Sequence, residues 1–433
     1  MPVPTSQRMT AQQAAALIEP RDSLGLPLGP GVPPALLTAL GQRNDWVDLR
    51  VFGALLLGLY SLFTRAGVRL RSGFFGPVER GLRAAGHDVQ FVPADFRRFT
   101  RLLAELSPRV MATLAAPPDE RGWMSLSLHA GATTHELHAA GRDPDRLLLV
   151  EVNPQLPRTL GLEPDAPHAL HLEEVDAVIE APGPLPVLPV APPGEREARI
   201  AREALRFVRP GATLQTGIGG IPGAIVSRLA ESEAGDFGVH SEMFTDGLMR
   251  LHRAGRVSNK GKGLYEGFSV CTFAGGSEEL YRWLDRNPEV RFLPVEAVNA
   301  PEVIARNRDM VCINGALAVD LQGQVAADTL GPRQFSGIGG HEDFTGSSGL
   351  GRSGRSLVCL PSTAQVAGRT VSRIVPLFEP GTTVTTPRHQ VDVIVTEHGA
   401  AELAGRTTEE RAEALVAIAH PDFRDTLRRA AHS

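Results

Sequence analysis

One glutamate stands where a side chain could act as a nucleophile or a general base. Glu242 lies in the segment GVHSEMFTDG (residues 238–247). The run Phe237–Val239 is strand-like, and Thr245 and Asp246 can cap a following helix. A carboxylate in a turn between a strand and a helix can face a cleft at the edge of a sheet. A solvated acidic turn has the same pattern, so the segment alone does not decide its role.

Two glycine clusters could bring backbone amides close to a ligand. Thr216–Gly223 (TGIGGIPG) lies between an expected strand and an expected helix, whose N-terminus favours negative charge. It is not the dinucleotide fingerprint, because no suitably placed acid follows a complete GxGxxG pattern. A second cluster, Phe335–Phe344 (FSGIGGHEDF), could present amides to a developing oxyanion. Each cluster is also compatible with a plain structural turn.

The lysines are confined to one short loop. Of the 44 lysine and arginine residues, only Lys260 and Lys262 are lysines, and both lie in NKGKG (residues 259–263). A compact, flexible ammonium group suits a contact with phosphate, where an arginine fork is not equivalent. The loop is therefore a candidate site for a phosphorylated ligand, and a solvated basic turn is the alternative.

The elements that must position these groups alternate short β-rich runs with helical patterns. This alternation predicts α/β architecture with parallel or mixed sheets. Strands are expected at residues 147–152, 212–216, 268–273, 310–313, 357–360 and 391–396, and helices at 195–208, 222–229 and 409–419. Arg355 lies in the glycine-rich run 349–356, and Glu397 follows the strand at 391–396. Neither residue suggests a role by itself.

The length of 433 residues predicts two domains, because one hydrophobic core does not grow to that size. Residues 181–194 (APGPLPVLPVAPPG) hold six prolines and no charge, which favours an extended connector. We therefore expect a boundary near residues 183–194, with an N-terminal domain over 1–185 and a C-terminal domain over 195–433.

Composition narrows the class of protein. With 42% hydrophobic and 21% charged residues the chain is not disordered, and its net charge of −5 argues against nucleic acid or an anionic membrane as partner. The longest apolar run, Val51–Phe63, is shorter than the ~20 residues of a membrane span. Three cysteines without metal-type spacing predict a reduced, cytoplasmic protein without a metal site.

Taken together and in this order, the segments resemble the acetyl-CoA hydrolase/transferase family, and within it the 4-hydroxybutyrate CoA-transferase type. The resemblance is strongest from Gly211 to Arg424. It is carried by GIGGIPGAI, GVHSEMFTDG, SNKGK, INGA, SGIGGHEDFTG, SRIVPL, TEHGAAELAGRT and AHPDFRD. PPDERGWMSLS (117–127) and EVNPQLPRTLG (151–161) are also similar to the family, and residues 1–110 match more loosely.

The resemblance implies two open α/β domains of the CoA-transferase fold with the active site between them. It implies that Glu242 is the nucleophile, that Asn314 and Gly339 or Gly340 line the oxyanion and acyl site, and that Glu397 helps to organise it. Contacts with CoA would come from Gly219, Gly220, Ile221, Pro222, Gly223, Lys260, Lys262 and Gly339. Arg355 stands where members often have lysine and would be a phosphate contact. The stretch 312–319 departs from the family around Asn314, which leaves the acyl substrate open.

The expected activity is transfer of CoA between a short-chain acyl-CoA and a small carboxylic acid by a cytoplasmic homodimer. CoA thioester would be a substrate, with no permanently bound cofactor. Three alternatives remain: an acyl-CoA hydrolase, if water reaches the intermediate; a sugar-phosphate isomerase-like enzyme, with Glu242 as base; and a non-catalytic CoA-binding protein. The presence of Glu242, Asn314 and Glu397 speaks against the last.

Overall fold

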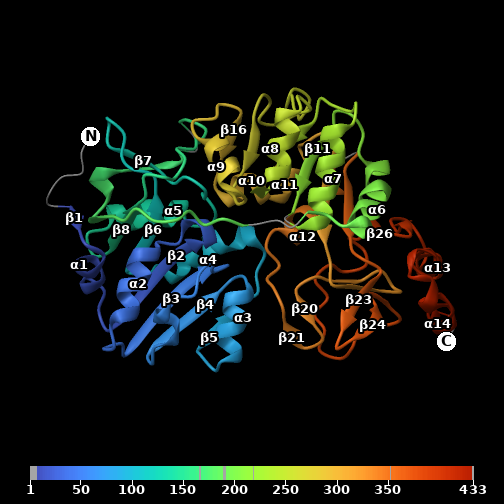
Figure 1. Cartoon of the computed structure of the whole chain (residues 1–433), viewed down its shortest axis with the longest axis horizontal. Coiled ribbons are helices and arrows are strands. Elements are labelled where there is room, and N and C mark those ends of the chain that lie inside the picture. The colour runs from blue at the N-terminus through green and yellow to red at the C-terminus, as the bar shows by residue number, and fades with distance from the viewer. Residues whose placement is uncertain (1–6, 165–166, 189–191, 218, 352, 432–433) are drawn as a thin grey trace. The chain divides into compact units, whose positions relative to one another are not determined.

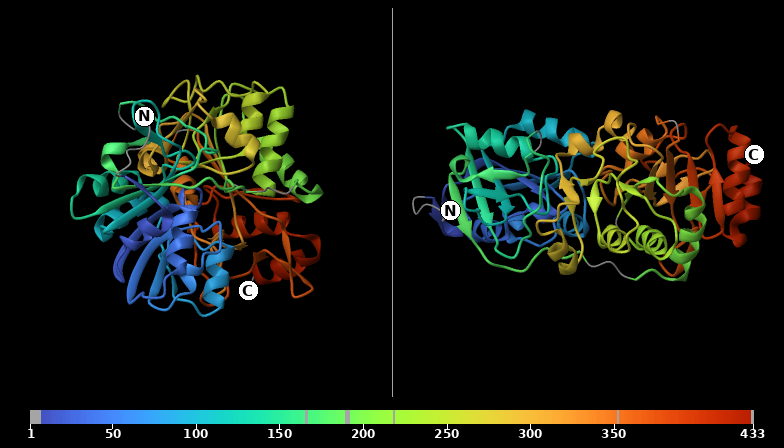
Figure 2. Two further views of the ribbon diagram at one scale, coloured as in Figure 1. Left: turned by 60° about the vertical axis from the view of Figure 1, so that its left-hand side comes forward. Right: turned by 90° about the horizontal axis from the view of Figure 1, so that it is seen from above.

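The computed structural model describes residues 7–164, 167–188, 192–217, 219–351 and 353–431. The chain forms two compact units (Figures 1 and 2). Unit 1 comprises Met1–Leu188 and Val270–Val298, and unit 2 comprises Pro189–Ser269 and Asn299–Ser433. The first change of unit falls within the proline-rich stretch. The expected limit of 195–433 differs in that Val270–Val298 packs with unit 1, and this passage carries no proline-rich marker of the kind that signalled the first.

Unit 1 is built on an eight-stranded parallel sheet in the order β1-β10-β8-β6-β2-β3-β4-β5. Its strands are β1 (Arg8–Met9), β2 (Arg21–Leu28), β3 (Asp48–Ala54), β4 (Val68–Ser72), β5 (Val89–Phe91), β6 (Val110–Ala115), β8 (Leu147–Val152) and β10 (Ala177–Glu180). The strand expected at 147–152 is confirmed as β8. Its continuous apolar run fits its place inside a parallel sheet, where both faces are covered.

Helices flank this sheet and supply its core. They are α1 (Ala11–Ala16), α2 (Pro34–Gln42), α3 (Pro77–Ala84), α4 (Phe99–Leu106) and α5 (Thr134–Arg142). The later segment adds α9 (Glu278–Leu284) and α10 (Val295–Asn299). Leu36 and Leu37 of α2 are fully buried in one cluster with Leu24 of β2 and Val51 of β3. Two short strands, β7 (Trp123–Ser125) and β9 (Ala169–His171), pair antiparallel beside it.

Unit 2 is built on a six-stranded sheet in the order β12-β11-β17-β22-β26-β27. The strands are β11 (Thr213–Thr216), β12 (Gly238–Val239), β17 (Met310–Gly315), β22 (Arg355–Cys359), β26 (Val393–Thr396) and β27 (Gly399–Glu402). All neighbours are parallel except β27, which pairs antiparallel with β26. The strands expected at 212–216, 310–313, 357–360 and 391–396 are confirmed within one to two residues at their ends.

Both faces of this sheet are covered by helices: α6 (Glu195–Ala204), α7 (Gly220–Glu231), α8 (Asp246–Arg253), α11 (Pro301–Ile304), α12 (His341–Ser348), α13 (Thr408–Ile418) and α14 (Pro421–Ala431). Leu357 of β22 packs in a cluster with α6 and α7, which lie side by side in Figures 1 and 2, whereas its neighbour Val358 packs in a second cluster with α13. Because successive side chains point to opposite covered faces, residues 357–359 of this strand are all apolar. The helices expected at 222–229 and 409–419 are confirmed, whereas the one expected at 195–208 ends at Ala204 and is followed by a 3-10 helix over Leu205–Phe207.

Smaller strands complete the chain. They are β13 (Met243–Phe244), β14 (Ser269–Cys271), β15 (Phe273–Ala274), β16 (Val290–Phe292), β18 (Ala318–Asp320), β19 (Val325–Ala326), β20 (Thr329–Leu330), β21 (Arg333–Gln334), β23 (Thr363–Val366), β24 (Arg369–Ser372) and β25 (Ile374–Val375). In the described part of the chain, no helix has both the length and the apolar character that crossing a membrane requires.

The parallel pairing in unit 2 gathers the candidate residues at one edge of the sheet. The carboxyl ends of parallel strands meet at a common edge, which is where open α/β sheets bind ligands. The first glycine cluster follows β11, Glu242 follows β12, Asn314 lies at the end of β17, and Glu397 follows β26.

Candidate active site

Glu242 lies in the bend between the end of β12 and the start of β13 at Met243, and α8 begins at Asp246 after this short strand, which the sequence did not indicate. Its side chain is partly buried. Asn299 Nδ2 donates a hydrogen bond of 2.7 Å to Glu242 Oε2, and the backbone N–H of Gly340 also donates to this carboxylate. The carboxylate is thus held by two donors, both in unit 2.

Gly340 must be a glycine for this arrangement to exist. A Cβ atom at position 340 would lie 1.9 Å from Glu242 Oε2 and 2.5 Å from Asn299 Nδ2, much closer than van der Waals contact allows. The carboxylate therefore rests directly on the backbone of the glycine cluster. This contact brings Glu242 and Gly340 together.

A second carboxylate lies behind the first. Asp343, fully buried in the first turn of α12, accepts a hydrogen bond of 3.0 Å from the same Asn299 Nδ2 atom that binds Glu242. Burial raises the pKa of Glu242 to about 8, and the negative charge of Asp343 adds to the rise, while the hydrogen bonds from Asn299 and Gly340 oppose it. The Glu242 carboxylate is consequently a much stronger base than an ordinary glutamate.

Sequence reasoning missed Asn299 and Asp343. Asn299 is the last residue of the short helix α10 and stands in an unremarkable segment, VNAPEV. Asp343 lies inside FSGIGGHEDF, which attracted attention only for its glycines. One signal was available: Asp343 is three residues after Gly340, so a helix beginning there would place both on one side of its first turn.

The first glycine cluster opens α7 and lines a cavity of about 520 Å³. Its lining consists of Pro192, Pro193, Gly194, Glu197, Gly217, Gly219, Gly220, Ile221, Pro222, Gly315, Ala316, Cys359, Pro361 and Arg373. Four of the five residues of the first glycine cluster that were predicted to contact CoA are therefore at this cavity. The fifth, Gly223, lies within the helix, where its N–H bonds to the carbonyl of Gly219. Burial raises the pKa of the Cys359 thiol to about 12, so this lining residue is a poor nucleophile.

The predicted residues Asn314 and Glu397 have contacts of their own. Asn314 is buried and bridges two elements: its Oδ1 accepts from Gln215 Nε2 at 3.3 Å, and its Nδ2 donates to Thr345 Oγ1 of α12 at 3.2 Å. Glu397 accepts hydrogen bonds from the backbone N–H and the hydroxyl of Ser362, at 2.9 and 2.8 Å. Their catalytic roles stay predictions.

The two lysines differ sharply in environment. Lys260 is exposed, whereas Lys262 is 1% exposed and its Nζ donates to the carbonyls of Val239 and Phe268 at 2.8 and 2.7 Å. Burial lowers the pKa of Lys262 to about 7. Val239 ends the strand that leads to Glu242, so these contacts favour a structural role for Lys262. In this conformation only Lys260 of the pair is open to a phosphate, and a ligand contact by Lys262 stays a prediction that its burial does not support.

Arg355 is also engaged by other side chains. Its guanidinium donates to both oxygens of Asp392, at 2.8 and 3.2 Å, and to Glu402 at 2.9 Å. Asp392 and Glu402 together carry more negative charge than the positive charge of Arg355. In this conformation Arg355 is therefore a poor partner for a phosphate. The phosphate contact expected of Arg355 stays a prediction, and these ion pairs favour a role in joining β22 to the edge of the sheet.

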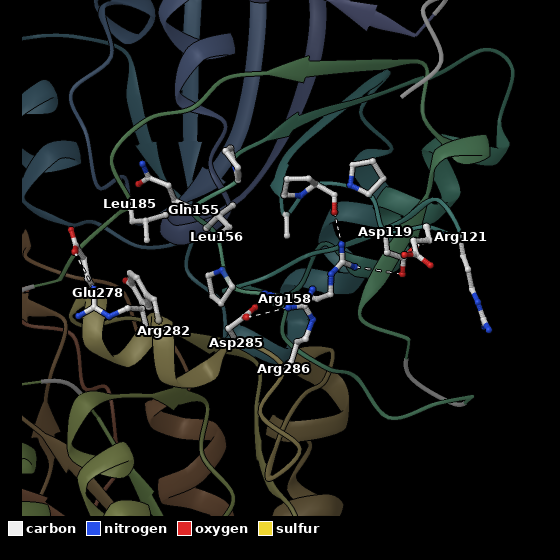
Figure 3. Close-up of a pocket in the computed structure, with 17 residues that line it drawn as sticks. Asp119, Arg121, Gln155, Leu156, Arg158, Leu185, Glu278, Arg282, Asp285 and Arg286 are labelled. Carbon is white, nitrogen blue, oxygen red and sulfur yellow. Dashed lines mark hydrogen bonds and ion pairs between the residues drawn. The ribbon is translucent and has the colours of Figure 1, made fainter. Parts of the chain in front are cut away.

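Unit 1 holds a larger cavity, of about 990 Å³, shown in Figure 3. Its walls come from residues 116–121, 154–158 and 278–286, with Leu185. The charged groups there pair with one another, as Arg158 does with Asp119 at 3.7 Å and Arg282 with Glu278 at 3.7 Å. None of the predicted catalytic residues lines it. Covalent chemistry is therefore better placed in unit 2.

Among the residues that the structure describes, no three His, Cys, Asp or Glu side chains gather closely enough to hold an ion. Asn299 and Gly340 supply hydrogen-bond donors to the Glu242 carboxylate.

Comparisons with known proteins identify the family to which the chain is related. Residues 276–431 match the model of the acetyl-CoA hydrolase/transferase C-terminal domain. The chain is 36% identical to 4-hydroxybutyrate coenzyme A transferase of Clostridium kluyveri, covering 97% of this chain and 96% of that protein. It is also 36% identical to succinyl-CoA:cyclohexane-1-carboxylate CoA transferase of Geobacter metallireducens, covering 97% and 93%. The crystal structure of RipA from Yersinia pestis superposes with a TM-score of 0.90 at 34% identity, covering 98% and 97%.

Relatives that bear the name acetyl-CoA hydrolase match a smaller part of the chain at lower identity. The relatives named here give no support to a sugar-phosphate isomerase-like enzyme. The α/β architecture and the resemblance drawn from the sequence are confirmed.

Proposed function

The chain is an enzyme of the acetyl-CoA hydrolase/transferase family, and we propose that it moves CoA from a short-chain acyl-CoA to a carboxylic acid through a thioester on Glu242. The observation that carries the proposal is the setting of Glu242, whose carboxylate is held by Asn299 and by the backbone of Gly340. A carboxylate of raised pKa, pinned beside amide donors, has the basicity and the orientation that a nucleophile needs.

The reaction proceeds by covalent exchange at Glu242. Its carboxylate attacks the thioester carbonyl, a carbon–oxygen bond forms, and the carbon–sulfur bond breaks to give an acyl–glutamyl anhydride and the CoA thiolate. The thiolate then attacks Cδ of Glu242, the anhydride bond at Cδ breaks, and the first acid leaves as its carboxylate. An acceptor acid repeats these steps in reverse and restores free Glu242.

The glycine-cluster cavity would hold part of the CoA. The 12-residue helix α7 begins at this cavity, and its N-terminus favours the phosphates of an anionic ligand. Exposed Lys260 would add a positive charge to the same unit. Binding energy from this remote part of the substrate can then appear as rate at the reacting carbon.

Intact mass spectrometry after incubation with acetyl-CoA tests the covalent step. We expect an adduct of the mass of CoA on the wild-type protein, mapped by peptide digestion to Glu242, and no adduct on Glu242→Ala. An adduct mapped to Glu397 or Cys359, or exchange activity in Glu242→Ala, would contradict the proposal.

Hydrolysis is the competing outcome of the same intermediate. A carboxylate is a better nucleophile than water, so CoA thiol release should be slow without an acceptor acid and fast exchange should follow when acetate is added. Thiol release that is equally fast without any acid would identify a hydrolase.

We further propose a homodimer acting in the cytoplasm. Three buried, free cysteines fit a reducing compartment, and the family resemblance favours the dimer. Light scattering coupled to gel filtration measures the oligomeric state, and a monomer at micromolar concentration would contradict it.

A further inference from the structure

We propose that Asn259 and Lys262 position the nucleophile: their side chains take the place of a missing neighbour strand along β12 and fix the backbone that leads into Glu242. This inference rests on the proposed function, because it concerns the same carboxylate. It gives Lys262 a role without a ligand, since its Nζ atom holds the protein backbone. Both are positioning residues, because they act on Glu242 through β12.

The strand before Glu242 has one open side. β12 is the last strand of the six-stranded sheet and pairs there with β11. The N–H groups of Gly238 and His240 donate to the carbonyls of Ala212 and Leu214 on that side, at 3.0 and 3.1 Å. Val239, between them, directs its N–H and carbonyl to the other side, because these groups alternate along a strand. Val239 is fully buried, so both groups need partners within the protein.

The lysine loop supplies both partners from side chains. The Val239 N–H donates to Asn259 Oδ1 at 2.9 Å, and Lys262 Nζ donates to the Val239 carbonyl at 2.8 Å. Each side chain is also anchored to the far end of the loop. Lys262 Nζ donates to the carbonyl of Phe268 at 2.7 Å, and Asn259 Nδ2 donates to Ser269 Oγ at 3.1 Å. The two side chains therefore do for β12 what a neighbouring strand would do.

The local backbone accommodates this arrangement. A Cβ atom on Gly238 would lie 2.3 Å from Lys262 Cγ, so the glycine makes room for the lysine stem. Asn259 is 2% exposed and has φ +55°, a left-handed conformation that asparagine tolerates better than most residues.

The chemistry of Lys262 fits a backbone contact better than a phosphate contact. Among the described residues, its Nζ contacts two carbonyls and no carboxylate. Burial lowers the pKa of Lys262 to about 7, and a neutral amine has two N–H donors, one for each carbonyl. The contact therefore needs no buried charge.

The consequence for Glu242 is a loss of rate and not of affinity. Val239 is three residues before Glu242, so a displaced β12 moves the carboxylate relative to the backbone of Gly340. Misplacement of a reacting group by about 1 Å can lower the rate by about 100-fold. CoA binding is unaffected by this displacement, because Nζ does not contact the ligand.

Two lysine variants test the inference through exchange of labelled acetate into acetyl-CoA. Lys262→Met keeps the apolar stem and removes both donated hydrogen bonds, and it should lower kcat by on the order of 100-fold with an unchanged KM for acetyl-CoA. Lys260→Met, at the exposed lysine of the same loop, should show the opposite pattern, a raised KM with kcat retained.

A truncated substrate separates backbone from phosphate contacts. Acetyl-pantetheine carries no phosphate, so the loss in Lys262→Met should persist by the same factor, whereas the effect of Lys260→Met should disappear. Arg411→Met is the matched control: it also removes a buried cation that donates to a backbone carbonyl, that of Arg388, and it should retain kcat.

The outcomes are distinguishable. An unchanged kcat in Lys262→Met, a loss that vanishes with acetyl-pantetheine, or an equal loss in Arg411→Met would overturn the inference and leave Glu242 as the nucleophile. Absence of a CoA adduct on wild-type Glu242 would instead overturn the proposed function. Should Lys262→Met not fold, Asn259 tests the same contact. Asn259→Asp keeps an acceptor for the Val239 N–H and should retain more activity than Asn259→Ala, and equal activity of these two variants would contradict the inference.

Discussion

Two glutamates of unit 2 follow parallel strands at the same edge of one sheet, yet their environments are opposite. Glu242, after β12, is held against Gly340 and near Asp343, and its pKa is raised to about 8. For Glu397, after β26, burial also acts to raise the pKa, but the backbone and hydroxyl hydrogen bonds from Ser362 outweigh it and hold the pKa below its ordinary value.

This difference separates a reacting group from a supporting one. When hydrogen-bond donors stabilise the ionised form of a carboxylate, its pKa falls and it is a weaker nucleophile toward a carbonyl. A carboxylate whose charge is poorly satisfied is more basic and gains more when its charge passes to the substrate. Glu242 therefore suits covalent chemistry, and Glu397 suits the fixing of the segment around Ser362.

The largest expected effect is the loss of exchange activity when Glu242 is replaced by glutamine, with the same replacement at Glu397 as the comparison. Glu242→Gln removes the nucleophile and should lower kcat by on the order of 10,000-fold or more. Glu397→Gln weakens a charge-assisted hydrogen bond worth about 1.5 kcal/mol, so a loss of about tenfold is expected. Steady-state exchange kinetics compare the two. Losses of equal size would end the distinction between them.

The next effect concerns the backbone on which Glu242 rests. Gly340→Ala would drive a methyl group into Glu242 Oε2 and Asn299 Nδ2 and displace the carboxylate, and misplacement by about 1 Å can lower the rate by about 100-fold. Gly349→Ala, just after the other end of α12, meets no atom within 4 Å and is the matched control. Equal activity of the two variants would contradict the close contact.

The pH dependence of kcat/KM should reflect the ionisation of Glu242 and not that of Glu397. Only the ionised Glu242 attacks, so kcat/KM should rise with pH and level off above about 8. Asp343→Asn removes the negative charge facing Glu242 and should move this inflection to lower pH, whereas Glu397→Gln should leave it in place.

The pH dependence of the free energy of unfolding provides an independent test of the raised pKa of Glu242. The raised pKa means that native Glu242 holds its proton between its ordinary value of 4.5 and about 8, a window in which the unfolded chain has released it. Stability attributable to this group is therefore lost as pH rises through that window. Urea unfolding of Glu242→Gln should show less of this decline, and an unchanged decline would contradict the raised pKa.

Local sequence patterns predicted the elements and the position of Glu242 well. The apolar run 147–152 and the helix after the first glycine cluster depend on short-range periodicity, which the sequence displays directly. Asn299 and Asp343 were missed because they meet Glu242 only through folding, across 57 residues in the case of Asn299. The prediction for the lysine loop failed to separate its two lysines for the same reason. The sequence gave no sign that Lys262 is buried and donates to the carbonyls of Val239 and Phe268.

The smallest expected effect is a change in stability when Ser362, the hydrogen-bond donor to Glu397, is replaced. Ser362→Ala removes the hydroxyl donor and keeps the backbone donor, so it should lower the free energy of unfolding by about 1 kcal/mol at neutral pH with little change in kcat.

The lowered pKa of Glu397 stabilises the fold above its ordinary value of 4.5, and this stability is lost as the pH falls through the lowered folded-state pKa. The variant should therefore lose less stability than the wild type between neutral and acid pH. Ser372→Ala, whose hydroxyl donates to Ile374 instead, is the control in urea unfolding at both pH values. If Ser362→Ala instead abolished exchange while folding normally, Glu397 would belong with Glu242 among the groups that act on the substrate.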